Sequence, residues 1–129
     1  MSQDNNPIPP EVLQAIEEFN SGAYFECHET LEALWLKETG ETKLFLQGLI
    51  QAAAGLLKIT HRHEKGSIRL LNTALEKLRP LENTSPFSSW IALESLVSEL
   101  SLLLNQIQTS GLGTIKINTL PKIQSSHVA

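Results

Sequence analysis

The segment LFLQGLIQAAAGLL, at residues 44–57, decides the fold. When it is drawn as an α-helix, apolar side chains occupy nearly its whole circumference. A helix of this kind is stable only with neighbours on several sides. We therefore expect a helix over residues 42–60 in the middle of an all-α bundle.

Four other segments have the apolar spacing of a helix, and they predict a single compact bundle of about five helices. These helices are expected over residues 9–19, 23–38, 65–79 and 88–108. The second and third helices in chain order are the central ones in this prediction. A chain of 129 residues can bury a core without disulfide bonds or metals.

The last part of the chain has a different pattern. The apolar residues that follow Gly111 are spaced irregularly among polar residues and Pro121. Glycine is a suitable residue to end a helix. We expect a helical bundle domain over residues 1–110 and an extended tail over residues 111–129, which docks along the bundle.

Composition argues against several classes of partner. The net charge is −4, and the ten lysines and arginines are spread along the chain, whereas nucleic-acid binding needs clustered cations. The longest apolar stretch, residues 49–57, contains Gln51 and is too short to span a bilayer. The single cysteine, Cys27, allows no internal disulfide, and no secretory signal is visible. We expect no nucleic-acid partner, no membrane contact and a cytoplasmic location.

The second predicted helix carries polar residues where apolar ones are expected. His28 and Glu32 are four residues apart, inside the apolar arc of Leu31 and Trp35, and Glu29 lies near its boundary. A buried carboxylate is costly unless it is paired or hydrogen-bonded. We therefore expect Glu32 to be mostly buried and hydrogen-bonded to a neighbour.

The third predicted helix offers partners for these groups. Gln47 and Gln51 are also four residues apart, with Gly48 and Gly55 on the same side. A glycine inside a helix costs about 1 kcal/mol relative to alanine, so a helix or a ligand is expected to approach closely there. In the simplest assembly, Gly48 makes room for His28 and Glu32 to face the two glutamines.

Three interpretations fit these residues. They form a buried polar network that fixes the register of two helices, a pocket for a ligand or substrate, or a metal site. The string His28-Glu29-x-x-Glu32 lacks the second histidine of the H-E-x-x-H zinc helices, and the Glu-x-x-His pattern of di-iron bundles is absent. We expect no metal and no cofactor. Cys27 lies on the core stripe, where a thiol behaves as a small apolar group.

Two motifs resemble a known family. They are FNSGAYFECHETLEALW at residues 19–35 and FLQGLIQAA at residues 45–53. In this order and at this separation they are similar to the domain-of-unknown-function family numbered 309, whose members are small helical proteins. The resemblance covers residues 19–78. It implies an all-helical bundle and no established activity.

The resemblance also implies a set of hallmark positions. They map here to His28, Glu29, Glu32, Trp35, Gln47, Gly48, Gln51 and Gly66. Members of the family often have a histidine near Lys58, and a Gly-Asn turn where Arg62 and His63 stand here. We expect the histidines of the turn at residues 61–63 to be solvated.

Two hypotheses for the function remain. The first is a non-catalytic helical binding or interaction module, and a homodimer is one form that it can take. Its buried polar network consists of His28, Glu29, Glu32, Trp35, Gln47 and Gln51. The alternative is a small ligand-binding or acid–base enzyme pocket built on His28, Glu32, Gln47 and Gln51. The first is favoured, because nothing in the sequence supplies the third group that normally orients an acid–base pair.

Overall fold

The structure, a computed structural model, describes residues 7–126. Within them the chain forms an all-α bundle of six helices, five long and one short. The helices are α1 (Pro10–Asn20), α2 (Tyr24–Trp35), α3 (Gly40–Thr60), α4 (Glu64–Leu78), α5 (Phe87–Trp90) and α6 (Leu93–Ser110). Short 3-10 turns follow α4 (Arg79–Leu81) and α6 (Leu112–Thr114 and Ile117–Thr119). No helix among the described residues is long and apolar enough to cross a membrane.

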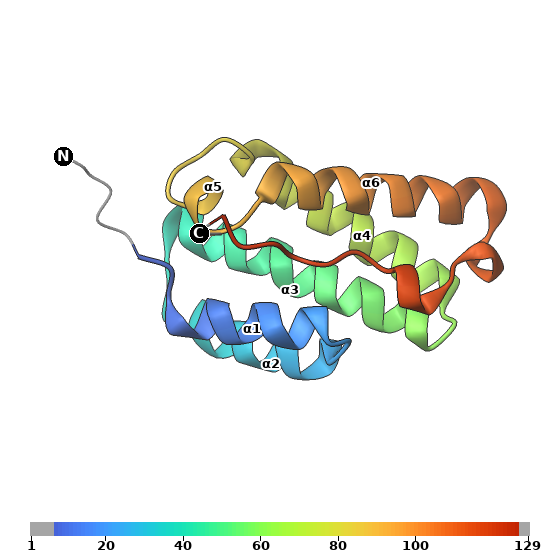
Figure 1. Cartoon of the computed structure of the whole chain (residues 1–129), viewed down its shortest axis with the longest axis horizontal. Helices are drawn as coiled ribbons and strands as arrows, with labels where there is room; N and C mark the ends of the chain where they lie inside the picture. Colours follow the sequence, from blue (N-terminus) through green and yellow to red (C-terminus); the bar gives the residue numbers. More distant parts are fainter. Residues whose placement is uncertain (1–6, 127–129) are drawn as a thin grey trace.

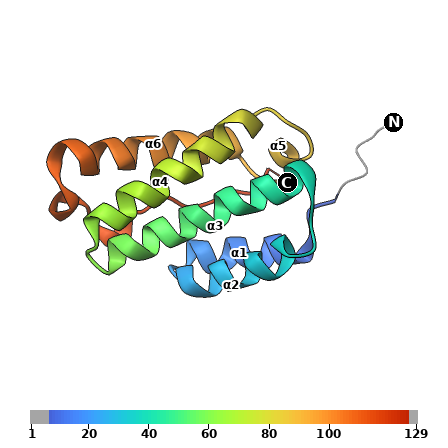
Figure 2. The same cartoon turned by 180° about the vertical axis from the view of Figure 1, so that it is seen from behind.

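Helix α3 occupies the middle of the bundle. The pair α1 and α2 packs on one side of it, and α4 and α6 lie on the other (Figures 1 and 2). Nine residues of α3 are buried: Phe45, Leu46, Gly48, Leu49, Ala52, Ala53, Gly55, Leu56 and Ile59. The prediction of an all-α bundle around this apolar segment is confirmed.

The glycines of α3 face α4. A Cβ atom added at Gly48 would lie 2.6 Å from Cδ2 of Leu78, and one added at Gly55 would lie 3.0 Å from Cδ2 of Leu71. Both distances are shorter than ordinary van der Waals contact, so these glycines allow the two helices to approach closely. The expectation that Gly48 makes room for His28 and Glu32 is therefore wrong.

The fifth predicted helix is interrupted. Ile91 has an extended backbone (φ −139°, ψ 162°) between α5 and α6, and it forms an isolated antiparallel bridge with Ser125. The backbone N–H of Ala92 donates to the carbonyl of Gln124 at 2.8 Å. The prediction of one continuous helix over residues 88–108 is wrong, because pairing with the tail replaces the helical hydrogen bonds at this point.

The tail after α6 is fastened to the bundle at several points. It runs across α3 between α1 and α6 (Figure 1). The amide of Asn20, at the end of α1, donates to the carbonyl of Ile123 at 2.8 Å and accepts from its N–H at 2.7 Å. Near the start of the tail, the N–H of Leu112 donates to Glu64 at 2.9 Å.

Apolar side chains of the tail belong to the core. Those that are buried are Leu112, Ile115, Leu120 and Ile123. We therefore describe the tail as a strap that closes one side of α3. The sequence predicts a bundle domain over residues 1–110 and a tail over residues 111–129. Residues 1–6 of the first and residues 127–129 of the second lie outside the described part of the chain.

The two hydrogen bonds between the Asn20 side chain and the backbone of Ile123, which we call the Asn20 clamp, lead to a stability prediction. Asn20→Ala removes both hydrogen bonds to the part-buried backbone of Ile123. We expect the free energy of unfolding, measured by urea denaturation, to fall by about 1–3 kcal/mol. Asn118→Ala is the matched control, because Asn118 is exposed in the same strap. An equal loss in the two variants would contradict the clamp.

Candidate functional site

A small recess opens to solvent between α2 and α3. Its volume is about 130 Å³, and it is lined by Glu32, Trp35, Gln47, Ile50 and Gln51. Four of these five residues belong to the predicted set. The remaining two predicted residues, His28 and Glu29, lie on α2, where each offers a ligand atom within 4.8 Å of Glu32.

Glu32 is exposed. The buried side chains of α2 are Tyr24, Cys27, Leu31 and Leu34, a narrower arc than the sequence pattern predicts. His28 and Trp35 are partly buried at the edge of this arc, and Glu32 lies beyond it. The prediction of a mostly buried, hydrogen-bonded Glu32 is therefore wrong, because the carboxylate reaches water and has no need of a protein partner.

Three predicted residues have a polar atom that is sealed from solvent and lacks a hydrogen-bond partner within residues 7–126. These atoms are Nδ1 of His28, Nε1 of Trp35 and Oε1 of Gln51. A buried polar atom without a partner costs about 1–3 kcal/mol. Such atoms are rare in folded proteins, and each one needs an explanation.

A sealed polar network does not supply that explanation. It requires hydrogen bonds among His28, Glu32, Gln47 and Gln51, and none joins them in the described part of the chain. The side chains share a region of the surface, as the spacing predicts, but they do not satisfy one another. Contacts within residues 7–126 therefore leave the three sealed atoms unsatisfied.

Lys43 is a residue that the sequence pattern did not single out. Its Nζ lies 4.2 Å from the centre of the Trp35 ring, in the range of a cation–π interaction. Lys43 lies one turn before Gln47 on α3, and this spacing is the only signal in the sequence that could have placed it beside the recess. The contact places the Lys43 ammonium over one face of the indole.

The turn between α3 and α4 contains a second missed feature. The N–H of Gly66 donates to Nδ1 of His63 at 3.1 Å, so His63 caps α4. A Cβ atom on Gly66 would lie 2.8 Å from the same nitrogen. His61 and His63 are both exposed, as expected, but His63 has a structural role in addition.

The cluster of His28, Glu29 and Glu32 lacks one usual feature of a metal centre. Its ligand atoms lie within 4.8 Å of one another, so they offer three of the four ligands that a zinc ion takes. A metal-bound histidine normally donates its second N–H to an acceptor. Nδ1 of His28 is sealed without such an acceptor among the described residues.

Cys27 is fully buried. Burial and, to a smaller extent, the negative charge of Glu18 raise the pKa of its thiol to about 12. The reactive species is the thiolate, so Cys27 is protonated and unreactive near neutral pH.

This pKa leads to a prediction about reactivity. At pH 8 we expect a chromogenic disulfide reagent to modify Cys27 on the order of 1000-fold more slowly in the folded protein than in the urea-unfolded chain, where the thiol pKa is about 8.5. The measurement is the rate of thiolate release from the reagent. Comparable rates in the two states would show an accessible thiolate and contradict the burial.

Comparison with known proteins gives a family and no activity. Residues 12–70 match the model of DUF309, described as a domain of unknown function. The match spans most of α1, all of α2 and α3 and the first part of α4, and it includes all six predicted site residues. No curated protein and no solved structure matches the chain.

Proposed function

We propose that residues 12–70, the part that matches the DUF309 model, form a non-catalytic binding module whose recess between α2 and α3 receives an amide group of a protein partner. The observation that carries the proposal is that two residues of the lining, Trp35 and Gln51, each have a buried atom without a partner among the described residues, Nε1 and Oε1 respectively. A binding module retains such atoms because the partner satisfies them.

The two atoms specify the chemistry of the occupant. An indole N–H only donates a hydrogen bond, and a carboxamide oxygen only accepts. The occupant must therefore accept from Trp35 and donate to Gln51. An amide does both, whereas ammonium and guanidinium groups only donate and a carboxylate only accepts. Both atoms are sealed in the free protein, so binding includes a side-chain rotation of the kind common at interfaces.

The size of the recess favours a group of a larger partner. A volume of about 130 Å³ is below the range of roughly 300–1,000 Å³ found for small-molecule pockets.

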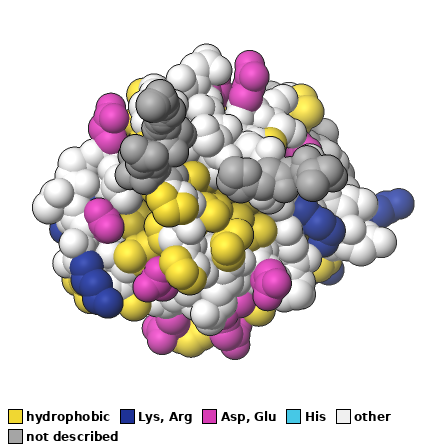
Figure 3. Space-filling view, turned by 60° about the vertical axis from the view of Figure 1, so that its left-hand side comes forward, with side chains coloured by type: hydrophobic (Ala, Val, Ile, Leu, Met, Phe, Trp, Pro, Cys, Tyr) yellow, Lys and Arg dark blue, Asp and Glu magenta, His cyan; other side chains and the backbone are white. Residues whose placement is uncertain are grey.

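Leu36, at the end of α2, is 69% exposed, and Leu44, near the start of α3, is 38% exposed. Figure 3 shows hydrophobic side chains gathered on the end of the molecule where α1 and α3 begin, with acidic side chains beside them. Exposed apolar surface of this kind is suited to a protein partner.

The acid–base enzyme has less support. Glu32 is the only titratable side chain that lines the recess, and it is exposed. His28 is near it but not hydrogen-bonded to it, and no third group orients the pair within residues 7–126. General acid–base catalysis depends on such positioning.

The first prediction from this proposal concerns stability. Gln51→Leu removes the sealed Oε1 atom and keeps a side chain of similar length, so we expect the free energy of unfolding to rise by about 1 kcal/mol. Gln106→Leu is the control, because the Gln106 amide donates to Oγ1 of Thr114 at 3.2 Å and its loss should not stabilise. A clear loss of stability in Gln51→Leu would instead favour a structural network.

The second prediction concerns binding. The chain has two tryptophans, so the ¹⁵N spectrum contains two indole N–H signals, which Trp35→Phe assigns. We expect acetamide to shift the Trp35 signal saturably and to leave the Trp90 signal in place. Methylammonium and acetate should produce no saturable shift, because each offers only donors or only acceptors. N-methylacetamide tests a backbone amide against the side-chain amide represented by acetamide.

Gln51→Leu is the variant that tests the second hydrogen bond to acetamide. It should weaken the acetamide response of Trp35 at least about tenfold, because one of the two hydrogen bonds is gone. The proposal is overturned by an acetamide response that is absent in the unchanged protein, or by one that persists unaltered in Gln51→Leu.

A further inference from the structure

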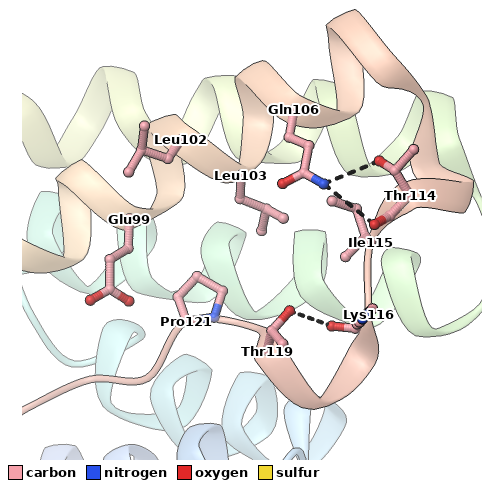
Figure 4. Close-up of a pocket in the computed structure, with 9 residues that line it drawn as sticks. All are labelled: Glu99, Leu102, Leu103, Gln106, Thr114, Ile115, Lys116, Thr119 and Pro121. Carbon is pink, nitrogen blue, oxygen red and sulfur yellow. Dashed lines mark hydrogen bonds between the residues drawn. The ribbon is translucent and has the colours of Figure 1, made fainter.

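A second surface hollow lies between α6 and the strap. It is a groove of about 390 Å³, and Figure 4 shows the residues that line it. Its apolar wall includes Leu102, Leu103 and Pro121. Leu102 is 68% exposed, on the face of α6 that points away from the core.

The polar groups inside this groove are satisfied by one another. Nε2 of Gln106 donates to the carbonyl of Thr114 at 3.3 Å and to its hydroxyl at 3.2 Å. The hydroxyl of Thr119 donates to the carbonyl of Lys116 at 2.7 Å. None of the sealed, unpartnered atoms among the described residues belongs to the lining. The groove therefore offers an apolar middle and no unsatisfied hydrogen-bonding group for a polar ligand.

Opposite charges lie at the two ends of the groove. Glu99 projects from α6 at one end, and Lys116 lies on the strap at the other (Figure 4). Both side chains are exposed, and neither makes an ion pair within residues 7–126. An exposed apolar centre between a free acid and a free base is complementary to itself when it is rotated by half a turn.

We propose that this groove is the interface of a homodimer, in which a second copy of the chain packs its own apolar wall of Leu102, Leu103 and Pro121 against this one across a twofold axis. In such an interface each contact occurs twice. Glu99 of one protomer faces Lys116 of the partner subunit, and Lys116 of the first protomer faces Glu99 of the partner subunit. The surface is separate from the α2–α3 recess, so this inference goes beyond the proposed function and does not depend on it.

Charge reversal tests the pairing. In Glu99→Lys the two copies bring lysine against Lys116 twice, and in Lys116→Glu they bring glutamate against Glu99 twice. We expect the dimer dissociation constant of each variant alone to be at least about tenfold higher than that of the unchanged chain. An equimolar mixture of the two variants should form heterodimers, because every contact then joins opposite charges. The measurement is sedimentation equilibrium over a concentration series.

Two controls separate the interface from general effects of charge. Glu94→Lys changes the net charge by the same amount on the same helix but lies outside the groove, so it should dimerise like the unchanged chain. The double variant with both reversals should also regain dimerisation, since its pairs are restored with exchanged signs. The proposal is overturned if the unchanged chain is monomeric throughout the series, or if the mixed variants associate no better than either one alone.

Discussion

The close packing of α3 against its neighbours is the constraint on which the rest of the structure depends. Because α3 is apolar on most sides, it has to be covered by several elements at once. The glycines at positions 48 and 55 bring α4 within van der Waals contact on one side, the α1–α2 pair covers another, and the strap closes a third. The partly buried residues Gln47 and Gln51 lie on the side that is least covered, and there the recess forms.

The two hollows on the surface differ in how their polar atoms are satisfied. The α2–α3 recess is small and includes polar atoms without partners, whereas the α6–strap groove is larger and its amides and hydroxyls bond to one another. An interior of the first kind selects an occupant by hydrogen bonds. An interior of the second kind selects by shape and apolar contact, with charge acting only at its ends. The groove has the larger volume, but the smaller recess has the more specific chemistry.

Sequence reasoning succeeded where periodicity is strong and failed at the edges of patterns. The apolar run of α3 predicts a central helix because nearly every position agrees. The spacing of Gln47 and Gln51 places them together, and the structure brings Glu32 and Trp35, which were predicted with them, to the same recess. Glu32 was misplaced because it lies near the boundary of the apolar arc, where one helical step decides between core and water. The break at Ile91 and the clamp at Asn20 depend on hydrogen bonds to the strap, whose partners lie up to 103 residues away. No local pattern contains such information.

The strap has a consequence for the order of events during synthesis. Its clamp joins Asn20 to Ile123, so the earliest helix of the bundle waits for nearly the last described residues before its contacts are complete. Until then, one flank of α3 is bare, and a nascent or truncated chain presents apolar surface that chaperones and proteases recognise. A chain that stops before the strap therefore lacks the buried side chains of Leu120 and Ile123 that cover this flank.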